Sequence, residues 1–149
     1  GRRINDAMGK HVAQTTIKKM IQQGIDVTKA TVGVLGLTFK ENCPDLRNSR
    51  VIDIIEEFQD HGIQVVAEDC WADDDEIKHE FPSITLANII ESEAVVDSLV
   101  VAVSHDQYAE LTPSQVRAML RPKQSVLADV KGLYCPLAME QQGILAWRL

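Results

Sequence analysis

Two lysines stand where the sequence could bind a phosphate group. Lys40 follows the apolar run TVGVLGL at 31–37, and Lys131 follows SVLADV at 125–130. An ammonium group is a compact charge that phosphate oxygens can share, so two lysines together suit a phosphate or diphosphate. Composition alone leaves open that both are solvated loop lysines, which are common on protein surfaces.

The two lysines can share a site only if both runs are strands of one sheet. Each run is continuously apolar, as expected of a strand that is covered on both faces. Further strands are predicted at 63–69, 98–104 and 143–149, and helices at 4–22, 50–62, 72–81, 86–93 and 113–121. This alternation predicts an α/β fold with a doubly wound, mostly parallel, Rossmann-like sheet. In such sheets ligands bind beyond the carboxyl ends of the strands, where Lys40 and Lys131 would lie.

Local signals set the ends of several helices. Asn48 or Ser49 is predicted to cap the helix at 50–62, and Thr112 followed by Pro113 is predicted to start another. The first helix is amphipathic and Gly24 would stop it. We therefore divide the chain into a helical segment at 1–24 and a sheet domain at 25–149, and we expect the helix to expose an apolar face that favours a homodimer.

Composition excludes several classes of protein. The chain has 149 residues and a formal net charge of −7, which argues against non-specific binding to nucleic acid. No apolar run approaches the roughly 18 residues that a membrane helix requires. Three cysteines without a C-x-x-C pair indicate neither a disulfide framework nor a zinc site. A reducing, cytoplasmic compartment is the expected location.

The segment VLGLTFKENCPDLRNSRVIDII, with GRRINDAMG before it and DVKGLY after it, closely resembles the C-terminal, nucleotide-sugar-binding domain of the UDP-glucose/GDP-mannose dehydrogenase family. The variant GLTFKENCPDLRNS is most similar to the bacterial branch that oxidises UDP-N-acetylhexosamines to uronic acids for surface polysaccharides. The resemblance implies an NAD-dependent UDP-sugar 6-dehydrogenase that acts in two oxidation steps. It also implies that the helix at 1–24 is the end of a central helix that forms the dimer contact.

The same resemblance implies which residues meet the UDP-sugar. Phe39 and Lys40 would belong to the substrate cleft, and Lys131 would approach it from a later strand. Many relatives carry arginine at the position of Lys131, so a planar fork is replaced by a point charge. For Arg47 two roles stay open: it reaches the phosphate, or it ties the loop to Asp45 and Glu41.

The family's chemistry needs parts that have no match in this sequence. The catalytic cysteine segment and the dinucleotide fingerprint G-x-G-x-x-G both lack a counterpart in residues 1–149. We therefore assign no catalytic, cofactor-binding or metal-binding residue, and we expect the chain to be inactive alone, with NAD bound mainly by another domain. The alternative is a stand-alone Rossmann-like binding or regulatory module, for which Glu68 and Asp69 would supply a ribose-binding acid.

Other residues invite chemical roles that the sequence does not favour. Cys43 could be a nucleophile but is better explained as a small residue packed before Pro44. Asp75 and His79 could hold a metal, but their segment reads as a solvated helix N-terminus. His105 and Asp106 are interpreted as a hydrogen-bonded loop pair rather than ligand contacts. The roles of Arg2 and Arg3 stay open between the partner subunit, the substrate and solvent.

Overall fold

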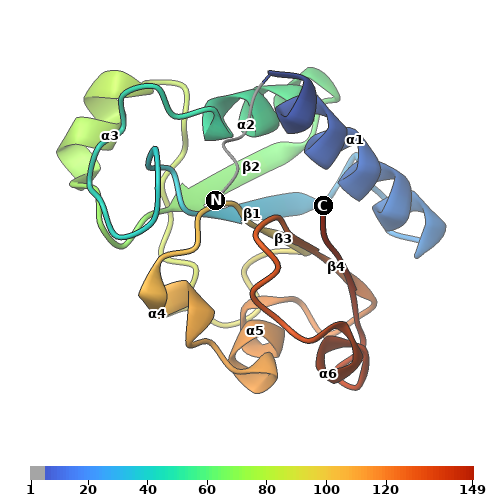
Figure 1. Ribbon diagram of the computed structural model, residues 1–149. Coiled ribbons are helices and arrows are strands. Elements are labelled where there is room, and N and C mark those ends of the chain that lie inside the picture. The colour runs from blue at the N-terminus through green and yellow to red at the C-terminus, as the bar shows by residue number, and fades with distance from the viewer. Residues whose placement is uncertain (1–5) are drawn as a thin grey trace.

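The computed structural model describes residues 6–149 and contains a five-stranded sheet (Figure 1). Its strands are β1 (Thr31–Leu35), β2 (Gln64–Glu68), β3 (Ser98–Val101), β4 (Ser125–Asp129) and β5 (Ile144–Trp147). Their order is β2-β1-β3-β4-β5, and every neighbouring pair is parallel. The predicted doubly wound parallel sheet, including its fifth strand, is confirmed.

Helices cover both faces of this sheet (Figure 1). One face carries α1 (Asp6–Gln22) and α2 (Val51–Asp60), and the other carries α4 (Asp106–Ala109), α5 (Pro113–Met119) and α6 (Pro136–Glu140), while α3 (Asp74–Glu80) follows β2. Side chains alternate along each strand, so each face has its own apolar core. Two covered faces explain why the strands read as continuous apolar runs.

The helix α1 packs against its own domain. Val12, Ile17 and Met20 are buried in the core that α1 shares with α2, and Trp147 Nε1 donates to Thr16 Oγ1 at 3.1 Å. The expectation that this helix exposes an apolar face was wrong, because the face is already covered. The division at residue 24 stays a prediction. No helix within residues 6–149 is long and apolar enough to cross a membrane.

The predicted caps are confirmed for one helix and wrong for another. At α5, Thr112 and Gln115 form a reciprocal capping box. At α2 the residue before the first turn is Arg50, which makes no side-chain cap. Ser49 Oγ instead accepts the Val51 N–H at 3.3 Å, one residue out of register with the prediction.

The predicted helix at 86–93 is absent. Its first residues run alongside the edge strand β2, where the Ala67 N–H donates to Thr85 O at 2.9 Å and the Ala87 N–H donates to Ala67 O at 3.0 Å. Ile89 is fully buried in the core of the other face. Edge-strand hydrogen bonds therefore compete with a short helix and determine the conformation of this segment.

Candidate functional site

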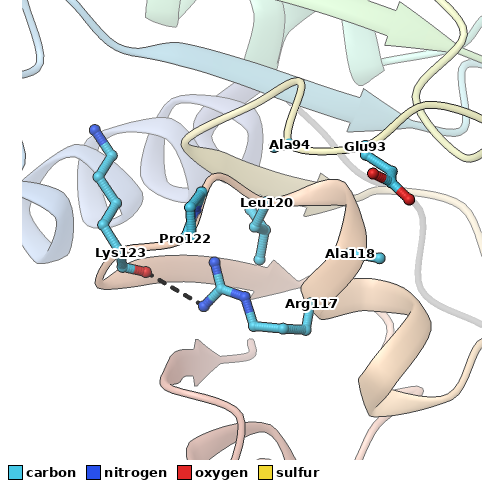
Figure 2. Close-up of a pocket in the computed structure, with 7 residues that line it drawn as sticks. All are labelled: Glu93, Ala94, Arg117, Ala118, Leu120, Pro122 and Lys123. Atoms are coloured by element: carbon cyan, nitrogen blue, oxygen red, sulfur yellow. Dashed lines mark hydrogen bonds between the residues drawn. The ribbon is translucent and has the colours of Figure 1, made fainter.

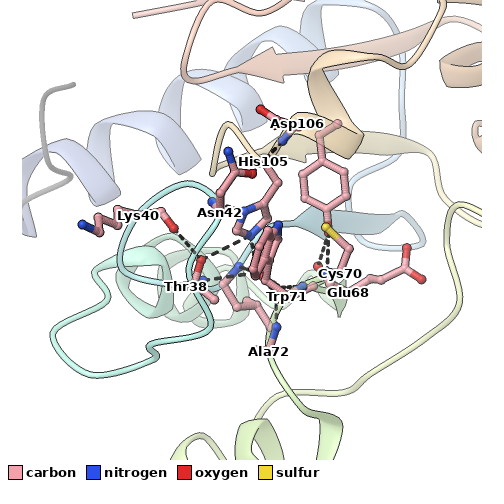
Figure 3. Close-up of polar contacts among 12 residues, drawn as sticks. Thr38, Lys40, Asn42, Glu68, Cys70, Trp71, Ala72, His105 and Asp106 are labelled. Carbon is pink, nitrogen blue, oxygen red and sulfur yellow. Dashed lines mark hydrogen bonds and ion pairs between the residues drawn. The ribbon is translucent and has the colours of Figure 1, made fainter.

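A long loop at 36–50 joins β1 to α2 and carries Lys40 at the carboxyl edge of the sheet. The Lys40 side chain is exposed, while its backbone carbonyl accepts the Thr38 hydroxyl at 3.0 Å (Figure 3). Phe39 is half-buried, and its N–H donates to Asp45 O at 2.8 Å. These hydrogen bonds fold the loop back on itself, so the backbone at Lys40 has a defined position.

Lys131 follows β4 at the same edge. Its side chain is half-buried; burial lowers the pKa of its ammonium group, and the charge of Glu41 opposes that shift. Glu41 belongs to the loop at 36–50, so this interaction brings the loops after β1 and β4 into the same electrostatic environment. The fold thus places both predicted lysines at one edge of the sheet.

The structure gives Arg47 a partner within its own loop. Its guanidinium group binds Asp45 through two contacts, Nε to Oδ1 at 3.0 Å and Nη2 to Oδ2 at 3.2 Å. The Arg47 side chain is nonetheless 82% exposed. An exposed pair of this kind adds little stability, so the loop can release the arginine at small cost.

A groove of about 720 Å³ lies between this loop and α3. Cys43 and Trp71 contribute to its walls, and so do five acidic residues, Asp45, Asp73, Asp75, Glu76 and Glu80. These five carboxylates outnumber the two basic side chains of the lining, Arg47 and His79, so the groove is a poor site for phosphate. Lys40 and Lys131 lie outside this groove, whereas Arg47 is part of its lining.

A second cavity, of about 440 Å³, lies at the opposite edge and is lined by Arg117 and Lys123 (Figure 2). Arg117 Nη1 donates to Lys123 O at 3.2 Å and to Gln142 O at 3.3 Å, and its Nη2 donates to Ser125 Oγ at 3.1 Å. The guanidinium group is therefore used to tie α5 to the start of β4. Its position at the amino ends of the strands also places it away from the ligand edge of a parallel sheet.

A buried polar network that sequence reasoning missed lies beneath the Lys40 loop (Figure 3). His105, which follows β3, is fully buried, and its Nε2 lies 3.1 Å from Asp69 Oδ2 and 3.2 Å from Thr38 Oγ1. Its Nδ1 accepts the Asn42 N–H at 2.9 Å. His105 is thus hydrogen-bonded as expected, but its partners come from distant segments rather than from the Asp106 side chain.

The remaining candidates have structural surroundings. Asp73 caps α3 by accepting the Glu76 N–H at 3.3 Å, which confirms the predicted acidic helix N-terminus. Among residues 6–149 no group of three or more histidine, cysteine or acidic side chains is arranged for a metal. Cys43, like the other two cysteines, is a free thiol. Arg2 and Arg3 lie outside the described residues.

Comparison with known proteins identifies the family of this chain. Residues 33–136 match the model of the UDP-glucose/GDP-mannose dehydrogenase family, UDP binding domain. The matched region includes the loop at 36–50, the His105 network and Lys131. The chain belongs to this family, and it carries the family's UDP-binding domain.

Curated relatives support the same assignment, and a solved structure supports the fold. The chain is 40% identical to UDP-N-acetyl-D-glucosamine 6-dehydrogenase of Salmonella typhi over 131 residues and 44% identical to protein CapL of Staphylococcus aureus over 133 residues. These matches cover 88% and 89% of this chain, which spans about 30% of each relative. The structure of an NDP-N-acetyl-D-galactosaminuronic acid dehydrogenase from Methanosarcina mazei superposes with a TM-score of 0.84 at 20% identity, over 97% of this chain and 29% of that one.

Proposed function

We propose that this chain supplies the nucleotide-sugar half-site of an NAD-dependent UDP-sugar 6-dehydrogenase. The observation that carries the proposal is the match to the UDP-binding domain across the loop that bears Lys40. Lys40 and Lys131 would share the diphosphate, and Phe39 would line the same cleft. Arg47 would join them after exchanging Asp45 for a phosphate oxygen, which a bidentate fork can bind equally well.

The substrate class proposed is a UDP-N-acetylhexosamine, which the whole enzyme would oxidise to its uronate. Several relatives are UDP-N-acetyl-D-glucosamine 6-dehydrogenases or UDP-N-acetyl-D-mannosamine dehydrogenases. The nucleotide fingerprint for NAD is not found in this sequence, so NAD would bind mainly to a different part of the longer protein. The chain alone would then bind UDP ligands and be inactive, and its free cysteines are consistent with the proposed cytoplasmic location.

Calorimetric titration of the 149-residue chain with UDP, UDP-N-acetylglucosamine and NAD tests this proposal. We expect heat of binding from the UDP ligands and none from NAD. Binding of NAD without UDP would overturn the assignment and would favour the alternative, a stand-alone dinucleotide-binding module.

The Lys40→Ala variant tests the site itself. Loss of one hydrogen bond to a charged group costs about 1.5–3 kcal/mol, which corresponds to roughly tenfold or more in affinity for UDP. Lys29→Ala is the matched control, because Lys29 is also exposed but precedes β1 at the opposite edge of the sheet. Equal affinity in both variants would refute the role of Lys40.

The homodimer through the N-terminal helix is also part of this proposal. The apolar face of α1 is covered within the chain, so the contact would use its outer face, where Ile21 is 58% exposed. Sedimentation velocity of the wild-type chain and of Ile21→Lys is the test. A wild-type monomer throughout the micromolar range would contradict this contact.

A further inference from the structure

In the strand order β2-β1-β3-β4-β5, the chain continues from β1 to β2 on one side and from β3 to β4 on the other. The topological switch point of the sheet therefore lies between β1 and β3. In doubly wound sheets this point is the usual ligand crevice. The imidazole of His105 is fully buried at this edge, 3.2 Å from Thr38 Oγ1 of the β1 loop (Figure 3) and 3.1 Å from Asp69 Oδ2 after β2. A ligand at this edge therefore meets the loop that lies over His105, and Lys40 is an exposed cation of that loop.

Both nitrogens of His105 hold the loop. The Asn42 N–H donates to Nδ1 at 2.9 Å, so Nδ1 is an acceptor and the ring proton of the neutral imidazole is on Nε2. Nε2 then donates to Asp69 Oδ2 at 3.1 Å. Thr38 Oγ1, 3.2 Å from Nε2, donates onward to Lys40 O at 3.0 Å. One ring is thus connected to the residues two positions before and two positions after Lys40.

The conformation of Asn42 indicates that these bonds restrain the loop. Asn42 has a φ of 54°, in the left-handed region that residues with a Cβ seldom adopt. Its backbone N–H binds His105, and its side-chain Oδ1 accepts the Asp106 N–H at 3.0 Å. Asparagine tolerates this region better than most residues, and here both bonds that hold it come from the segment after β3.

Asp69 anchors the network from the end of β2. Its carboxylate accepts the Leu37 N–H at 2.6 Å, the Trp71 N–H at 2.7 Å and the Ala72 N–H at 2.9 Å in addition to the bond from His105. Burial alone would raise the pKa of Asp69, but these hydrogen bonds outweigh it and the pKa lies below its usual value. The buried group is therefore a charged acceptor that fixes the orientation of the imidazole.

We propose that His105 and Asp69 are positioning residues for nucleotide-sugar binding: they hold the β1 loop so that Lys40 meets the diphosphate before the ligand arrives. This inference rests on the proposed function, because it acts through Lys40. Preorganisation of this kind raises affinity by removing the cost of ordering the loop during binding. The network is buried beneath the loop and its bonds flank Lys40 on both sides, so its effect on binding is expected to depend on Lys40.

A double-mutant cycle on the 149-residue chain, with calorimetric affinity for UDP-N-acetylglucosamine as readout, tests the inference. We expect His105→Ala to weaken binding roughly tenfold, comparable to the loss of one charged contact. In the Lys40→Ala background the same change is expected to have no further effect. His105→Asn keeps an acceptor near the position of Nδ1 and is expected to recover part of the affinity.

Ser98→Ala controls for a general loss of stability. The buried Ser98 hydroxyl donates to Val126 O at 2.7 Å at the amino ends of the strands, away from the loop, so this variant is expected to lose stability but not affinity. If the His105 variants do not fold, Thr38→Val replaces them, because it keeps the side-chain shape and removes the hydroxyl that joins the ring to Lys40 O. It too is expected to weaken binding only when Lys40 is present.

The possible outcomes separate the inference from the proposed function. Unchanged binding in Lys40→Ala would refute the proposed site and with it the inference. Weaker binding in Lys40→Ala, together with wild-type affinity in His105→Ala or Thr38→Val, would overturn the inference alone. Additive losses in the double variant would also overturn it, since they would show that His105 does not act through Lys40.

Discussion

Gly36 is the position at which a single methyl group should disturb this fold most clearly. It directly follows β1, has a φ of 98°, and donates its N–H to Glu68 O at 2.9 Å. A Cβ at this position would lie 2.7 Å from Val103 Cβ and 2.8 Å from Val103 N. One of these atoms is backbone, so the clash cannot be relieved by rotation of a side chain. The glycine is required by the close approach of the chain after β3.

The expected loss for Gly36→Ala has two parts. The left-handed conformation costs about 1–2 kcal/mol for a residue with a Cβ. Overpacking against a rigid neighbour adds about 1–3 kcal/mol. The sum is roughly 2–5 kcal/mol, a large share of the roughly 5–15 kcal/mol that stabilises a typical domain. For a chain of this size it corresponds to a fall in Tm of roughly 4–20 °C.

Urea denaturation of Gly36→Ala and Gly24→Ala separates the two parts. Gly24 has a φ of 80°, and a Cβ there would have no atom within 4 Å, so its substitution carries only the conformational cost. We expect Gly36→Ala to lose at least about 1 kcal/mol more than this control. Equal losses in the two variants would refute the argument from close approach.

Two further predictions concern titration. Burial raises the pKa of Tyr108 and of Tyr134, the two tyrosines of the chain. A free tyrosine ionises at pH about 10, so we expect the folded protein to show no phenolate absorbance at that pH. A titration step near pH 10 in the folded protein would contradict this prediction. Burial alone would raise the pKa of Asp97, but bonds from Lys123 and the Thr31 N–H, together with the charge of Arg121, lower it overall. Its folded pKa thus lies below the unfolded value of about 3.9, so its contribution to stability is present above that pH and is lost as the pH falls through the folded pKa. Denaturation at pH values between about 5 and 3 should show that loss, and Asp97→Asn should reduce it; an identical pH dependence in the variant would refute the assignment.

The sheet could be predicted because its strands carry their own signal. Each buried strand is a short apolar run, and the helices between them are long enough to form crossovers. The segment at 86–93 could not be predicted in the same way. Leu86, Ile89 and Ile90 have a spacing that also suits a helix, and the competing hydrogen bonds come from Ala67, which is distant in the sequence. Local periodicity contains no information on such pairing.

The lysines of the candidate site could be placed from topology alone, because loops after parallel strands emerge at one edge. The network beneath them could not. Asp69 and His105 are 36 residues apart, and nothing in either segment specifies that their side chains meet at 3.1 Å. The available signal was a histidine directly after a buried strand and an acid directly after another. That signal indicates proximity at the sheet edge but not which groups are buried together.

The acids at the end of β2 also decide between the two readings of the sequence. A dinucleotide-binding module would use such an acid for the ribose and would start a helix directly after β1 to hold the phosphates. Here Asp69 is 6% exposed, and its carboxylate accepts hydrogen bonds from His105 and from backbone N–H groups. Glu68 Oε1 accepts the Ile90 N–H at 3.1 Å. The helix after β1 begins only at Val51, beyond the whole Lys40 loop. Asp69 and Glu68 are therefore hydrogen-bonded within the chain, and Lys40 is the residue that we propose meets an anionic ligand.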